Sequence, residues 1–165
     1  MNVFIFGDPK GQPRARAFAR KMGAKHVARM YDSDVADAWK QAVDLGIERE
    51  LRAHPVAHDP TDAFDCALTF FFRRPKSHYG KGGHVKASAP VCHVSKPDAD
   101  NLAKLVLDRI TRGGRIWRDD SQVARLRVEK YWAITDARIG VYVTLGWLVG
   151  GRDVVELPLP DERKA

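Results

Sequence analysis

The chain has 165 residues, of which 44% are hydrophobic, and it carries a formal net charge of +7. This length suits one ordinary domain. No apolar run approaches the roughly 20 residues that a membrane span needs, and the first residues lack the features of a signal peptide. The two cysteines, Cys66 and Cys92, have no zinc-binding spacing and form no disulfide framework, so a reducing cytoplasm is expected.

The positive charge is concentrated in two segments that contain no acidic residue, 10–29 and 73–96, while acids outnumber bases elsewhere. Segregated positive charge is typical of a surface that binds a polyanion, most often nucleic acid. A merely solvated face would mix in acids, and a membrane surface would favour an apolar stripe that neither segment shows. The residues expected to contact nucleic acid are Lys10, Arg14, Arg16, Arg20, Arg73, Arg74, Lys76, Lys81, Lys86 and Lys96.

The first half of the chain predicts a short strand at 2–6 and then a loop rich in glycine and proline at 7–14. The basic residues through Arg29 are expected to form a mobile or partly ordered arm. Asp32 or Ser33 is expected to cap a helix that runs to about Arg52. Near-helical spacing predicts its apolar face, made of Val35, Ala38, Trp39, Ala42 and Leu45.

Residues 63–73 alternate in the manner of a strand. The predicted inner face consists of Phe64, Cys66, Leu68, Phe70 and Phe72. A loop at 74–96 follows, and a loop of this length in a small domain is usually functional or disordered. Its histidines, with Cys92, are an alternative zinc site, although their irregular spacing argues against one.

A second helix is predicted to begin after Pro97, because Asp98, Asp100 and Asn101 are good N-cap residues. Its apolar stripe is predicted to contain Leu102, Leu105, Val106 and Ile110. Steps of four residues place Asp100, Lys104 and Asp108 together on the opposite side. The pair Gly113–Gly114 ends the helix.

The remaining chain predicts two strands, at 123–133 and 138–148, joined as a hairpin. The order of elements predicts an α+β fold: a single domain with a mixed sheet of about four strands and two main helices. This domain is expected to span 1–150 and to be followed by a C-terminal tail at 151–165.

Four aspartates around the second helix are candidates for chemistry. A strand–turn–helix–turn can bring Asp98, Asp100 and either Asp119 or Asp120 to one helix N-terminus. An N-capped helix with an acidic turn is the structural alternative. A calcium loop fails, because an oxygen ligand and a glycine are missing at the following positions. Carboxylates suit magnesium or manganese, and beside basic segments they indicate phosphodiester hydrolysis, with Lys104 donating to a phosphoryl oxygen.

The stretch KPDADNLAK at 96–104, followed by Asp108 and by WRDDSQV at 117–123, resembles the signature of the RusA-type Holliday junction resolvases. These crossover junction endodeoxyribonucleases are common in prophages. The resemblance implies a homodimer that binds four-way DNA junctions and uses Mg²⁺, with Mn²⁺ as a possible substitute, to nick two opposing strands symmetrically. It implies catalytic and metal-binding roles for Asp98, Asp100 and Asp120, an essential Lys104, and a supporting Asp119.

The sequence departs from that signature in two places. Residues 94–97 replace an arginine run that some members carry before the first aspartate, and the 73–96 loop is long. Three alternatives remain open: a phage nuclease acting on forks or other branched DNA, a non-catalytic branched-DNA-binding module, and a magnesium-dependent nucleotide hydrolase.

Overall fold

The computed structural model describes residues 1–13, 16–22, 25–31, 36–55, 62–149 and 153–154. Its strands are β1 (Asn2–Phe6), β2 (Arg16–Met22), β3 (Lys25–Tyr31), β4 (Ala63–Phe72), β5 (Val123–Trp132), β6 (Gly140–Val149) and β7 (Asp153–Val154). Its helices are α1 (Asp37–Ala53) and α2 (Ala99–Gly113), with short 3₁₀ turns η2 (Lys76–His78), η3 (Asp120–Gln122) and η4 (Asp136–Arg138). Within these residues, no helix is long and apolar enough to cross a membrane.

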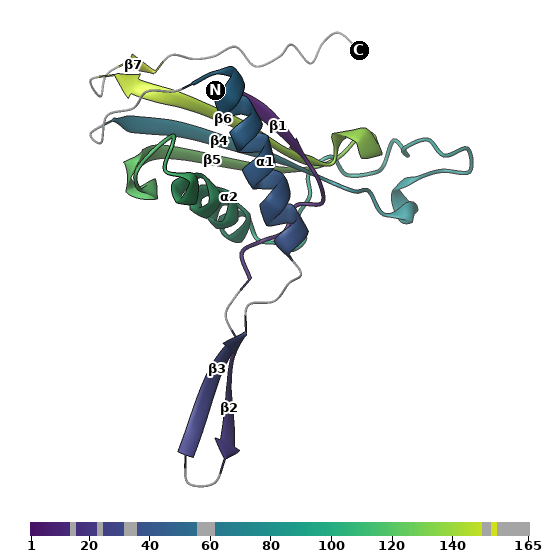
Figure 1. Ribbon diagram of the computed structural model, residues 1–165. Coiled ribbons are helices and arrows are strands. Elements are labelled where there is room, and N and C mark those ends of the chain that lie inside the picture. The colour runs from purple at the N-terminus through teal and green to yellow at the C-terminus, as the bar shows by residue number, and fades with distance from the viewer. Residues whose placement is uncertain (14–15, 23–24, 32–35, 56–61, 150–152, 155–165) are drawn as a thin grey trace.

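One mixed sheet forms the centre of the molecule, with the strand order β1-β6-β4-β5 and the short β7 paired with β6. Strand β4 runs antiparallel to β6 and parallel to β5. Helices α1 and α2 pack against one face of this sheet (Figure 1). The predicted α+β fold, with a mixed sheet of about four strands and two main helices, is confirmed.

The core is built from the two most regular sequence patterns. On β4 the five residues predicted to face inward are all buried, because successive side chains of a strand point to opposite faces. On α2 the predicted stripe is buried as well, and Ala103 and Leu107 widen it. Gly114, in the left-handed conformation at φ 58°, ends this helix as predicted.

Helix α1 presents a different apolar face from the predicted one. Its buried residues repeat every four positions: Trp39, Val43, Ile47 and Leu51. Ala38 is exposed and Leu45 is 67% exposed, so their assignment to the stripe is wrong, and Val35 lies outside the described residues. The helix is oriented by its contact with β1, where Gly46 lies so close to Ile5 that an added Cβ would be 2.8 Å from Cγ1. The expected caps, Asp32 and Ser33, lie outside the described residues.

The basic segment after the first loop is a hairpin and not the expected arm. Strands β2 and β3 pair antiparallel from Arg16 opposite Tyr31 to Met22 opposite Lys25. They form a separate two-stranded sheet that extends away from the main sheet (Figure 1). Backbone hydrogen bonds hold such a ribbon together without one continuous apolar face, so hydrophobic alternation does not predict it.

The predicted hairpin between the last two long strands is also wrong. Strands β5 and β6 are not neighbours, because β4 lies between them and pairs with both. The chain therefore crosses the end of β4 through residues 133–139. Strand β4 has the most regular apolar face, so the central position buries it better than an edge would.

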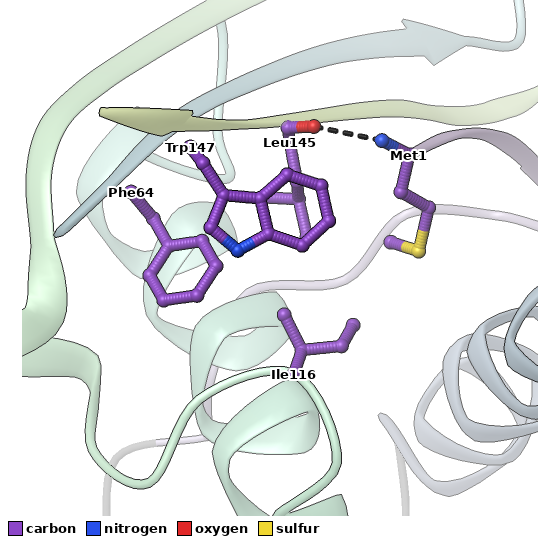
Figure 2. Close-up of a pocket in the computed structure, with 5 residues that line it drawn as sticks. All are labelled: Met1, Phe64, Ile116, Leu145 and Trp147. Carbon is purple, nitrogen blue, oxygen red and sulfur yellow. Dashed lines mark hydrogen bonds between the residues drawn. The ribbon is translucent and has the colours of Figure 1, made fainter. Parts of the chain in front are cut away.

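The N-terminus is fixed to strand β6 of the main sheet. The amino group of Met1 donates a hydrogen bond of 2.8 Å to the carbonyl oxygen of Leu145 (Figure 2). Phe64, Ile116 and Trp147 complete the lining of a small apolar pocket beside it. Burial lowers the pKa of the Met1 amino group. Of the predicted tail at 151–165, residues 153–154 form β7 and the others lie outside the described residues.

Candidate active site

The acidic motif occupies the first turn of α2. Asp98 is the N-cap residue in an extended conformation, and its side chain makes no capping hydrogen bond. Asp98 and Asp100 are both exposed, and neither carboxylate has a hydrogen bond or ion pair with a described residue. The positive end of the helix dipole favours negative charge at this position. These two carboxylates are therefore available to a ligand.

Lys104 lies one turn further along α2. Its Nζ is 3.8 Å from Oδ1 of Asp108, and its side chain is 62% exposed. An exposed pair at this spacing contributes only a few tenths of a kcal/mol. The ammonium group can therefore leave Asp108 for a stronger anion at small cost.

In the later acidic pair, Asp119 has a structural role, whereas Asp120 is exposed. Asp119 accepts a hydrogen bond of 2.9 Å from the backbone N–H of Ser121 and caps η3, with Gln122 completing the capping box. The hydrogen bonds from Ser121 hold the pKa of Asp119 below its usual value. The carboxylate of Asp120 is exposed and has no such partner among the described residues.

The two acidic groups lie at opposite ends of α2 within one chain. Trp117 Nε1 donates a hydrogen bond of 2.7 Å to Thr111 Oγ1. This bond holds the segment that leads to Asp120 against the last turn of α2. Asp98 precedes the first turn, and a helix of 15 residues is about 22 Å long. Among the described residues, no three acidic, histidine or cysteine side chains are placed to hold a metal ion. The expected gathering of three aspartates is therefore not found in a single chain.

Two contacts that the sequence did not reveal hold the start of α2. Lys130 Nζ donates to the carbonyl oxygens of Ser95 and Pro97, at 2.7 Å each. From the other side, the backbone N–H of Gln12 donates to the carbonyl oxygen of Asn101 at 2.9 Å. In the sequence, the signal for Lys130 is its position two residues after Val128, which places it on the same face of the strand as that apolar residue.

Two of the residues expected to bind DNA also form hydrogen bonds that stabilise the 74–96 loop. Arg74 donates to the carbonyl oxygens of Ala133 and Pro90, at 3.1 and 2.9 Å. Lys86 Nζ donates to the carbonyl oxygen of Ser77 at 2.9 Å. These donors fold the loop back on itself and onto the end of the sheet. They are partly occupied before any DNA arrives.

The other expected contacts are distributed over three regions. Arg73 forms an ion pair with Asp136 beside the loop. Lys76, Lys81 and Lys96 are exposed, and Lys10 is half-buried. Arg16 and Arg20 belong to β2, and Arg14 lies outside the described residues. The basic residues thus belong to the hairpin, the first loop and the long loop.

Exposed carboxylates at a helix start can bind a metal ion, and basic loops can bind the phosphates of nucleic acid. The family model described as endodeoxyribonuclease RusA matches residues 7–144, which include both acidic groups. The chain therefore belongs to the RusA endodeoxyribonuclease family, a family of Holliday junction resolvases, as its motif predicted. Comparison with curated proteins gave no match.

Proposed function

We propose that this chain is a magnesium-dependent endonuclease that resolves four-way DNA junctions by paired, symmetric nicking. The observation that carries the proposal is the pair of exposed carboxylates of Asp98 and Asp100 at the start of α2, inside the matched region, which have no partner among the described residues. Lys104 is the third member of this site. Membership in an endodeoxyribonuclease family supplies the reaction class, and the site residues supply the chemistry.

The donor set fits a magnesium ion. Mg²⁺ is commonly bound by one or two carboxylates together with waters and substrate phosphate, and Asp98 and Asp100 offer two carboxylates open to solvent. Mn²⁺ accepts the same oxygen ligands. Bound there, such an ion would polarise the scissile phosphate and lower the pKa of a water ligand.

The chain's own residues draw in and orient the DNA. The exposed lysines of the long loop and the basic hairpin attract the phosphate backbone, so affinity should fall steeply with salt. Lys104 donates a hydrogen bond to a phosphoryl oxygen as negative charge develops on it.

A second copy of the chain completes the proposed site. Asp120 is the better third ligand, because Asp119 is engaged in capping η3. Asp120 follows the C-terminal end of α2 while Asp98 precedes its first turn, and among the described residues of one chain no three acidic side chains are placed to hold one ion. In a homodimer with antiparallel α2 helices, Asp120 of each protomer would approach the Asp98 of the other. Two sites related by a two-fold axis would also account for symmetric nicking.

The test is nicking of a synthetic mobile four-way junction with Mg²⁺, against EDTA, with forks and linear duplex at equal salt. Asp98→Asn and Asp100→Asn should each abolish cleavage while junction binding persists, and Asp37→Asn on α1 is the matched control. Cleavage by either variant at the wild-type rate would refute the assignment. Faster nicking of forks than of four-way junctions would identify forks as the preferred substrate.

Mixing two inactive variants tests the shared site. If each site takes Asp120 from the second copy, dimers of one Asp98→Asn chain and one Asp120→Asn chain contain one intact site. Such mixtures should recover nicking of a single strand. If all ligands came from one chain, both sites of the mixed dimer would be defective and no cleavage would return.

A further inference from the structure

Lys130 holds the segment that leads into α2 through both its side chain and its main chain. Its Nζ lies 2.7 Å from the carbonyl oxygen of Ser95 and 2.7 Å from that of Pro97. Its own carbonyl oxygen accepts a hydrogen bond of 2.9 Å from the backbone N–H of His93. One strand residue therefore fixes three points within the five residues 93–97.

The contact with Pro97 reaches the acidic motif directly. The carbonyl of Pro97 belongs to the peptide group whose nitrogen is that of Asp98. Because a peptide group is planar, fixing this oxygen fixes the direction in which the Asp98 backbone begins. The side chain of Asp98 makes no capping hydrogen bond that could orient it by other means.

The strength of this attachment follows from its charge and burial. An ammonium group that donates to carbonyl oxygens forms charge-assisted hydrogen bonds, which are stronger than neutral ones. Lys130 is only half-buried, so the desolvation cost of placing its ammonium group here is modest. Gly11 packs closely against the same segment, since an added Cβ would lie 3.2 Å from the Cβ of Asn101 and 3.3 Å from the Cβ of Pro97.

We propose that Lys130 is a positioning residue that sets the direction of Asp98 for metal binding. This inference rests on the proposed function, since it assigns a support to the same site. Lys130 Nζ donates to the backbone carbonyl oxygens of Ser95 and Pro97, so the role proposed for it is positioning and not catalysis. Residues that orient metal ligands in this way usually contribute 10–100-fold to metal affinity or activity.

The test replaces Lys130 by methionine, which keeps the length of the side chain and removes the donor. Binding of Mn²⁺ to the DNA-free protein, followed by electron paramagnetic resonance, should weaken by about tenfold or more. The Mg²⁺ concentration for half-maximal junction nicking should rise in parallel, while junction affinity without metal changes little. Lys130→Arg should restore part of the loss. Lys40→Met on α1 is the matched control and should match wild type.

A resonance of His93 reports whether the contact was removed in a folded protein. Burial and the charge of Lys130 lower the pKa of His93, so this pKa should rise in Lys130→Met. A raised His93 pKa with wild-type Mn²⁺ binding and Mg²⁺ dependence would overturn the inference. If Lys130→Met fails to fold, the same comparison is made with Lys130→Gln, which removes the charge and shortens the side chain, and unchanged metal binding in that variant overturns the inference. Absence of nicking by wild type would instead refute the proposed function.

Discussion

Arg109 on α2 forms a bidentate pair with Asp44 on α1 along one edge of its guanidinium group: its Nε lies 2.7 Å from Oδ1, and its Nη2 contacts Oδ2. The side chain of Arg109 is 17% exposed, and the hydrogen bond that it donates to Asp44 raises the pKa of Arg109. We expect Arg109→Met to lower the free energy of unfolding by about 2 kcal/mol, because hydrogen bonds to charged groups contribute roughly 1.5–3 kcal/mol. Urea unfolding measures this loss.

The matched control for that change is Arg52→Met on α1. Arg52 pairs with Glu48, and their side chains are 77% and 53% exposed. Exposed pairs contribute little, so this control should alter stability by less than about 0.5 kcal/mol. An equal loss of stability in the two variants would show that the Arg109–Asp44 pair contributes no more than an exposed pair.

Thr111→Val should destabilise the protein by about 1–3 kcal/mol, because it leaves the buried indole N–H of Trp117 without its acceptor. Trp117 is fully buried, and its Nε1 lies 2.7 Å from Thr111 Oγ1. The two side chains have similar volumes, so packing is largely retained. Thermal and urea unfolding of Thr111→Val and of Thr111→Ser decide it: the serine variant keeps an acceptor and should recover part of the loss.

Acid should weaken the protein through His93. This side chain is buried, stacks on Phe72 with a centroid separation of 3.9 Å, and has no partner for Nδ1 among the described residues. Burial, followed by the charge of Lys130, lowers its pKa below the usual value of about 6.5. The unfolded chain therefore binds the proton first, and stability falls as pH drops below about 6.5 until the folded pKa is reached.

Urea unfolding at several pH values between 8 and 5 tests this dependence on His93. A single proton changes stability by at most about 1.4 kcal/mol per pH unit. His93→Phe should flatten the slope, while His54→Gln, which alters an exposed histidine, should not. A slope that persists in His93→Phe would assign the acid sensitivity to another group.

Asp119 and Asp120 should respond differently to removal of their charge. Since hydrogen bonds from Ser121 lower the pKa of Asp119, its contribution to stability is complete above the ordinary carboxyl pKa and is lost as pH falls through the lowered one. Asp119→Asn should therefore weaken η3 at neutral pH. The difference in stability between this variant and wild type should become smaller as the pH falls. Asp120→Asn should leave stability nearly unchanged and abolish nicking. Carbon-detected titration of both carboxyl groups gives the two pKa values.

Lys104→Met should reduce the rate of nicking by about 10²–10³-fold at saturating Mg²⁺, which is the usual effect of removing one donor to a developing anion. Junction affinity should change by only a few fold, because the ammonium group is one exposed charge among many. Single-turnover kinetics separates the two quantities. A purely electrostatic role in DNA binding would instead change affinity and its salt dependence while leaving the saturated rate intact.

The elements that were predicted correctly from the sequence are those whose hydrophobic residues repeat without interruption. Strand β4 alternates over ten residues, and α2 combines a capping residue, a stripe and a terminal glycine. These local preferences agree with the tertiary packing, so they survive in the structure. The family and the acidic motif were recognised from short spacings that do not depend on knowing how strands pair.

Pairing and distance were harder to predict. Neighbouring strands in sequence usually pair, yet β4 separates β5 from β6 because it is hydrogen-bonded on both edges. The distance between Asp98 and Asp120 depends on which way α2 runs along the sheet. A loop and a helix of the same lengths could have returned Asp120 beside Asp98. Only the tertiary structure decides between those paths.

Strands β4 and β5 are parallel, so the chain must travel back along the sheet between them, and it does so through the 73–98 segment and α2. Arg74 ties the beginning of that segment to the sheet, and backbone hydrogen bonds from His93 and to Val91 tie its end. Length changes between these anchors leave the strand register and the first turn of α2 undisturbed. The tip of this excursion can therefore change in length while the acidic residues at the start of α2 keep their attachment to the sheet.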